Sequence, residues 1–128
     1  MEVNKAVVRF KDGSLRKGKI TDFFPNKNEF HLQSLNGEIV NIDLEDLKAI
    51  FYVRDFEGNK ERTDRYNDVI PGGGRKIRVQ FLDGEILNGY SQGYSPDRSG
   101  FFLIPADKQG NNERVFIIKT ATVEITLL

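Results

Sequence analysis

His31 is the only histidine in this chain, and the chain has no cysteine. A metal site or a nucleophile with its base needs at least two such groups at a suitable separation. In a strand, His31 points away from the face that its neighbours Phe30 and Leu32 share. The lack of cysteine also excludes disulfides and thiolate zinc sites. We therefore expect an ordinary outward histidine, no metal, no cofactor and no catalytic residue, hence no enzyme.

Asp43, Glu45 and Asp46 form an acidic cluster of the kind that serves glycoside hydrolysis or a hard cation. No glycine gives the cluster the spacing of a calcium loop, so we expect a solvated turn that begins one helical turn. PGGGRKI (residues 71–77) has the glycines of a phosphate loop. It lacks the G-x-x-x-x-G-K-[ST] spacing, and a strand pattern follows where a helix would have to begin, which favours a linker.

The strongest electrostatic feature is a group of basic residues on the first predicted hairpin, namely Lys11, Arg16, Lys17 and Lys19. Such a group can contact phosphates, and each contact adds salt sensitivity. However, the 19 basic residues of the chain balance 19 acidic ones, and few aromatic residues lie between the lysines to stack bases. Lysine on an edge hairpin also prevents edge-to-edge aggregation. Anion or RNA contact and simple solubility both remain as readings of this group.

The composition describes a globular protein of one ordinary domain or two very small ones. The chain has 128 residues, of which 38% are hydrophobic and 30% are charged. MEVNKAVVRF lacks the apolar run of a signal peptide, and no segment approaches the ~20 apolar residues of a membrane helix. These features predict a cytoplasmic protein without a membrane partner.

The chain contains an internal duplication. Shifting the sequence by 71 positions aligns residues 5–34 with residues 76–105, and the identical pairs are Lys5/Lys76, Val8/Val79, Phe10/Phe81, Asp12/Asp83, Gly13/Gly84, Gly18/Gly89, Pro25/Pro96, Phe30/Phe101 and Leu32/Leu103. After a longer loop in the second copy the offset becomes 74, as in Ile42/Phe116 and Leu44/Ile118. We interpret this as two copies of one unit. The predicted boundaries are residues 1–56, a polar linker with a glycine hinge at 57–75, and residues 76–128.

Alternating apolar and polar residues predict five short strands in each copy. Asp12-Gly13 and its copy Asp83-Gly84 have the composition of two-residue type I′ hairpin turns, which would place Phe10 opposite Leu15. Gly18 and its equivalent Gly89 interrupt the second strands, as expected where a sheet bends or bulges. The predicted fold class is all-β, with two tandem five-stranded small barrels of the SH3-like or Sm-like kind.

The run V-x-F-x-DG-x-L-x-x-G-x-I-x-x-F at residues 8–23 resembles the first motif of Sm and Sm-like proteins, including bacterial Hfq. SH3-like barrels open with a similar bent hairpin. The paired form, with GFFLIPAD and NNERVFII in the second copy, also resembles uncharacterised bacterial domains. The Sm resemblance implies RNA binding by an Asp and an Asn after the second strand and by an Arg-Gly near the fourth. Phe24 and Ser95 stand at the Asp position, and no Arg-Gly follows, so the resemblance extends to the fold and not to this RNA site.

Two strands of the second copy are apolar on both faces. In GFFLIP, Phe102 and Ile104 lie on the face opposite the predicted core, and RVFIIK adds Phe116 and Ile118. Such strands must be covered by the first copy, by the linker or by another chain. We therefore predict a non-enzymatic binding module whose interface contains these four residues and whose partner is a protein or a second copy.

Two alternative functions stay open. RNA or a phosphate ligand would bind through the basic first hairpin. Arg62 and Arg65, with DRSG at residues 97–100, resemble the signatures of PilZ domains, which bind cyclic di-GMP. The arginine spacing is one residue short of that signature, and the second motif is two residues short.

Overall fold

The computed structural model describes residues 4–58 and 65–128. Its ten strands are β1 (Lys5–Phe10), β2 (Leu15–Ile20), β3 (Glu29–Ser34), β4 (Ile39–Asp43), β5 (Leu47–Val53), β6 (Arg75–Phe81), β7 (Ile86–Ser91), β8 (Gly100–Pro105), β9 (Asn112–Ile118) and β10 (Thr122–Leu127). One turn of 3-10 helix precedes β5, at Leu44–Asp46, and another precedes β10, at Lys119–Ala121. No α-helix occurs in the described ranges, so the predicted all-β class is confirmed.

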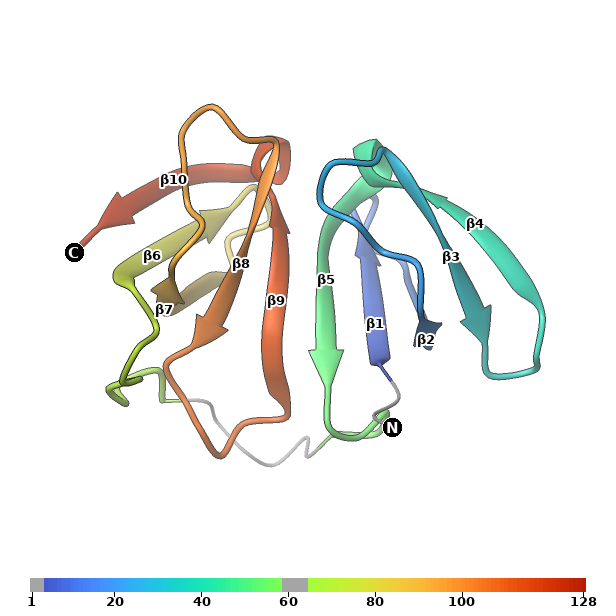
Figure 1. The fold of residues 1–128 in the computed structure, drawn as a ribbon, viewed down its shortest axis with the longest axis horizontal. Coiled ribbons are helices and arrows are strands. Elements are labelled where there is room, and N and C mark those ends of the chain that lie inside the picture. Colours follow the sequence, from blue (N-terminus) through green and yellow to red (C-terminus); the bar gives the residue numbers. More distant parts are fainter. Residues whose placement is uncertain (1–3, 59–64) are drawn as a thin grey trace.

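The ten strands form one antiparallel sheet in the order β10-β6-β7-β8-β9-β5-β1-β2-β3-β4. Strand β5 of the first unit pairs with β1 on one side and with β9 of the second unit on the other. Figure 1 shows β9 and β5 running side by side between two curved halves. The expected pair of separately closed barrels is not confirmed, because the sheet stays open and has β4 and β10 as its edges.

The joint between the units explains why β5 and β9 are apolar on both faces. Every residue of β5 is buried. Because side chains alternate across a strand, β5 and β9 each direct one face into the first core and the other face into the second core. Phe116 and Ile118 of β9 pack into the first core, beneath β1–β5, while Phe51 and Val53 of β5 pack into the second core, beneath β6–β10. Each unit therefore completes the core of the other.

The tips of the two matching hairpins differ from the prediction. Leu15 pairs with Arg9, and Ile86 pairs with Gln80, so neither lies opposite the preceding phenylalanine. The predicted type I′ turn is wrong because only the glycines, at φ +93°, adopt the left-handed region. Asp12 instead accepts a hydrogen bond from the Ser14 amide at 2.9 Å, which stabilises a longer loop. Leu15 and Ile86 consequently face solvent, at 41% and 45% exposure.

Gly18 and Gly89 are required by close packing between strands. A Cβ on Gly18 would lie 2.3 Å from the Gln33 carbonyl oxygen, and one on Gly89 would lie 2.3 Å from the Ile104 carbonyl oxygen. The pairing with the preceding strand continues past both glycines without a register shift. Glycine therefore permits the second and third strands of each unit to approach, rather than forming a bulge.

Further contacts tie Lys48 of the first unit, and the linker, to the second unit. Lys48 of β5 is 8% exposed, and its ammonium lies 2.7 Å from Asp83 Oδ2 and 2.5 Å from Glu85 Oε1 in the second unit. The described part of the linker packs against the second unit: the Asp68 amide donates to the Ala106 carbonyl at 2.7 Å. The Gly73 backbone is buried beside Tyr90.

Candidate functional site

The four residues of the predicted interface do not share one environment. Phe116 and Ile118 are 2% and 5% exposed, within the first core. Phe102 is half-buried, and Ile104 is 38% exposed. The first unit therefore covers Phe116 and Ile118, which is one of the three kinds of cover that the sequence left open. Only Phe102 and Ile104 present surface to another molecule.

Phe102 and Ile104 line an apolar groove of about 240 Å³. Tyr90 of β7 and Pro25, in the loop between β2 and β3, contribute further apolar walls. Arg98, in the turn before β8, is exposed and lies at the groove. This surface is apolar and concave, with a cation beside it, and both units contribute to it.

Two further aromatic rings, those of Phe23 and Phe116, pack against Phe102. The Phe102 ring lies 5.0 Å from that of Phe116 and 6.1 Å from that of Phe23, measured between centroids. Phe23 in turn packs edge-on against Phe116 at 4.7 Å. Edge-to-face pairs of this kind hold rings in fixed orientations and contribute beyond their buried area. Phe102 is therefore fixed by its contacts with Phe23 and Phe116, while part of its ring remains exposed to solvent.

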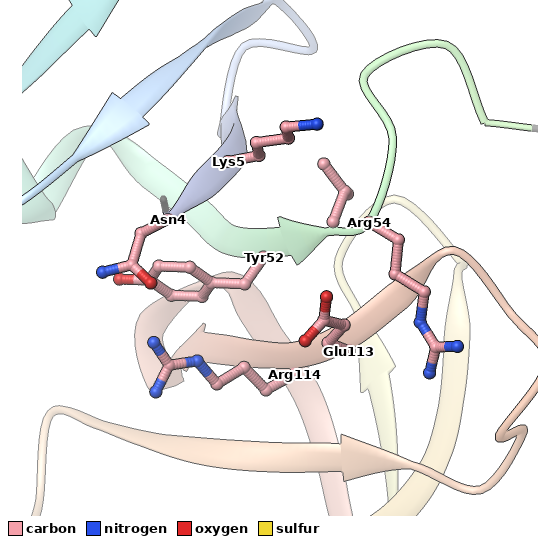
Figure 2. A pocket seen from close by; sticks show the side chains of 7 residues that line it. Asn4, Lys5, Tyr52, Arg54, Glu113 and Arg114 are labelled. Atoms are coloured by element: carbon pink, nitrogen blue, oxygen red, sulfur yellow. The ribbon is translucent and has the colours of Figure 1, made fainter. Parts of the chain in front are cut away.

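A second concavity, of about 310 Å³, lies where the first and second units meet (Figure 2). Asn4 and Lys5 come from the start of β1, and Tyr52 comes from near the end of β5. Strand β9 contributes Arg114, which is paired with Tyr52 in the sheet. Its remaining lining residues are Val53, Arg54 and Glu113. We call this concavity the seam pocket.

Arg114 is held by aromatic rings. Its Cζ atom lies 4.3 Å from the centroid of the Tyr52 ring and 5.1 Å from that of Phe102. Within residues 4–58 and 65–128, no carboxylate oxygen comes within ion-pairing distance of this guanidinium. Tyr52 is 5% exposed, and burial raises its pKa to about 12, although the nearby Arg114 charge acts in the opposite direction. The phenol is therefore neutral and able to donate at physiological pH.

The basic residues of the first hairpin do not converge on one site. Lys11 donates to the Glu45 carbonyl and to Thr120 Oγ1, both at 2.7 Å. Lys17 donates to the Phe56 carbonyl at 2.7 Å. Arg16 and Lys19 are exposed, but they lie on opposite faces of β2. Two of the four predicted contacts are thus held against their own chain.

The remaining sequence candidates lie apart from both concavities. His31 is exposed as expected, and its Nδ1 lies 2.6 Å from Asp22 Oδ2. Asp43 caps the 3-10 turn by accepting from the Glu45 amide at 3.0 Å, as predicted for the acidic cluster. In the part of the chain that the structure describes, no three His, Cys, Asp or Glu residues gather as a metal site.

The structure describes Arg65 and residues 97–100 of the PilZ-like signature. Arg62 lies outside the described residues. The Arg65 amide donates to Asp107 Oδ2 at 3.0 Å. Residues 97–100 form the turn into β8.

The family model of DUF6982, described as a family of unknown function, matches residues 2–128. The chain belongs to this family. The match covers all ten strands of the sheet. No curated protein and no solved structure matches the chain. None of the described residues of this DUF6982 member forms a helix long and apolar enough to cross a membrane.

The seam pocket of this DUF6982 member was not predicted from the sequence. Arg114 reads as an ordinary polar residue at the start of an apolar strand, and Tyr52 as one of several apolar positions in β5. The sequence contained one signal for this pocket. Both β5 and β9 have apolar residues on both faces, which indicates that the two strands lie next to each other in the core. It does not indicate which residues end up opposite one another.

Proposed function

We propose that this chain is a non-enzymatic binding module that holds a segment of another protein in the apolar groove at Phe102 and Ile104. The supporting observation is that the groove is concave and apolar although it is open to solvent. Exposed apolar surface of this kind is typical of protein interaction sites. No nucleophile with a positioned base accompanies it among the described residues, and a binding role needs none.

Charge indicates the chemistry of the partner. Arg98 is exposed and lies at the groove. A segment that inserts one apolar side chain into the groove and carries Asp or Glu next to it would match both the apolar walls and the Arg98 cation. Such complementarity favours specific over promiscuous binding. The proposed partner is therefore an acidic peptide segment with a single aliphatic or aromatic anchor.

A displayed library of random peptides tests this proposal. Selected sequences should contain an apolar residue flanked by acidic residues, and the synthetic peptides should shift the backbone NMR signals of residues 90–93 and 101–104. Ile104→Glu should abolish these shifts because it places a carboxylate in the groove at an exposed position. Leu82→Glu is the matched control, since Leu82 is 66% exposed and lies on the hairpin between β6 and β7. Equal binding by both variants, or selection of basic peptides, would refute the proposal.

Self-association through the same groove has a separate signature. Sedimentation would then show a dimer in the native chain and in Leu82→Glu, and a monomer in Ile104→Glu. That result would replace the acidic peptide by a second copy of this chain as the occupant.

Contact with RNA phosphates is a second candidate function. It is favoured by Lys19 lying directly opposite Lys5, because like charges facing each other across strands are unfavourable without an anion nearby. A salt-sensitive shift of labelled uridine-rich RNA, lost when Arg16 and Lys19 are both changed to Glu, would support it. Binding that is unchanged in the double variant would contradict it.

A further inference from the structure

The seam pocket has a composition that the peptide-binding proposal does not use. Its charged residues are Lys5, Arg54 and Arg114, which are cationic, and Glu113, which is anionic. The pocket therefore carries an excess of two positive charges. Lys19 pairs with Lys5 across β1 and β2 but does not line the pocket. A concavity of one sign concentrates ions of the opposite sign.

The polar groups of the pocket are mainly donors. The Tyr52 side chain is buried, and in Figure 2 its hydroxyl lies beside Asn4, on the same side as the Arg114 guanidinium and away from Glu113 and Arg54. Within the described ranges this hydroxyl has no hydrogen-bond partner. A buried hydroxyl left without a partner costs free energy, so a ligand that accepts its hydrogen bond gains affinity. The Asn4 amide is a further donor at the same side of the pocket.

Arg114 is oriented for an anion before any ligand arrives. Its Cζ atom lies 4.3 Å and 5.1 Å from the centroids of the Tyr52 and Phe102 rings, and among the described residues no carboxylate pairs with its N–H groups, which can therefore donate to another acceptor. An arginine that is already fixed loses little side-chain entropy on binding. The fork of N–H groups matches two oxygens of a tetrahedral or planar anion.

We propose that the seam pocket binds the phosphate group of a small phosphorylated ligand, with Arg114 and Tyr52 as its main donors. A phosphate dianion complements the positive charge of Arg114, and it offers several acceptor oxygens to the donors of Arg114, Tyr52 and Asn4. The volume of about 310 Å³ holds the phosphate together with a small organic substituent. Because the pocket and the apolar groove use different residues for recognition, this proposal does not depend on the peptide-binding function.

The test is an NMR titration of the ¹⁵N-labelled chain with inorganic phosphate, at a pH of about 8, where the ion is a dianion. A single group held by a few charged hydrogen bonds binds in the range of ~1 mM, which such a titration measures. The expected result is a saturable shift of the Arg114 Nε–H and Asn4 side-chain signals. Ribose 5-phosphate should shift the same signals at a lower concentration if the natural ligand is a phosphate monoester. Equal affinities would identify free phosphate as the ligand.

Variants assign the binding to named atoms. Arg114→Gln should weaken phosphate binding by at least about tenfold, because it removes a charged donor. Arg78→Gln on β6 is the matched control, since Arg78 is exposed and does not line the pocket. Tyr52→Phe should weaken binding by about threefold or more while the rest of the spectrum is retained. If Arg114→Gln does not fold, Asn4→Asp at an exposed position should abolish binding by adding a carboxylate.

Three results would overturn the proposal. The first is the absence of any saturable shift with phosphate or with ribose 5-phosphate. The second is equal phosphate affinity in Arg114→Gln and Arg78→Gln. The third is binding of a short oligouridine RNA at the pocket signals when neither small phosphate binds, because that would assign the cations to a nucleic acid track.

Discussion

Replacement of Gly89 by alanine tests the close approach of β7 and β8. The new Cβ would lie 2.3 Å from the Ile104 carbonyl oxygen and 2.9 Å from Leu103 Cγ. Optimal separations between non-bonded heavy atoms start near ~3.5 Å, so the first contact is more than about 1 Å too short. The obstacle is a backbone atom, which a change of side-chain rotamer cannot move. The two strands must therefore separate.

The expected cost follows from what that separation disrupts. Overpacking alone costs about 1–3 kcal/mol. The recorded pairing of β7 with β8 is short, Gly89 with Pro105 and Tyr90 with Ile104, and each backbone hydrogen bond lost there adds about 1 kcal/mol. We expect Gly89→Ala to lower the free energy of unfolding by about 3 kcal/mol, which corresponds to a fall of roughly 10 °C in Tm for a chain of this size.

Urea denaturation followed by circular dichroism measures this loss. Gly93→Ala is the matched control, because a Cβ there meets no atom within 4 Å and Gly93 does not need the left-handed region. Both variants restrict the unfolded chain equally, and Gly93→Ala should be neutral or gain up to about 1 kcal/mol. A loss below about 1 kcal/mol in Gly89→Ala, measured against this control, would show that the strands are not held at the distance described.

Three further predictions concern the joint, the seam pocket and the hairpin register. Changing Asp83 to Asn together with Glu85 to Gln leaves the buried ammonium of Lys48 without a counterion, and should lower the free energy of unfolding in urea by about 2 kcal/mol. This is less than the loss of a fully buried pair, because both carboxylates are about half exposed. An unchanged urea midpoint would contradict this prediction. Burial raises the pKa of Tyr52 from 10.0 to about 12, so the neutral phenol stabilises the fold fully below pH 10.0, and the native chain should lose up to about 3 kcal/mol as the pH rises to about 12. The Tyr52→Phe variant should lack that decline, and parallel declines in the two proteins would be inconsistent with it. Leu15→Ala should cost less than about 1 kcal/mol because the side chain faces solvent, whereas a cost of 2 kcal/mol or more, typical of a buried leucine, would restore the inward register.

Local sequence patterns were sufficient to predict the strands. Alternation of apolar residues located all ten, and LKAIFYV was bounded at both ends as the structure has it, at Leu47–Val53. The single helical turn expected near the acidic cluster is the 3-10 turn at Leu44–Asp46. These features depend on residues that are close in the sequence, and the local physics of strand periodicity and capping determines them.

The pairing between the units was not predictable in the same way. Two copies of one unit can each close on themselves or share an edge, and the periodicity of every strand is the same in both cases. The contact between Tyr52 and Arg114 exists only because β5 pairs with β9. The hairpin register failed for a more local reason: Asp12 has an ordinary φ and accepts a hydrogen bond, which composition alone did not separate from a type I′ turn.

The polarity of the two outermost strands limits how far this architecture extends. By strand pairing, Asn41 of β4 occupies the position that Phe116 has in β9, and Glu124 of β10 occupies the position that Ala49 has in β5. A third unit docking at either end would trap an amide or a carboxylate where the existing joint has hydrocarbon. The two edge strands therefore disfavour further pairing, because each carries a polar side chain where the matching strand at the joint carries an apolar one.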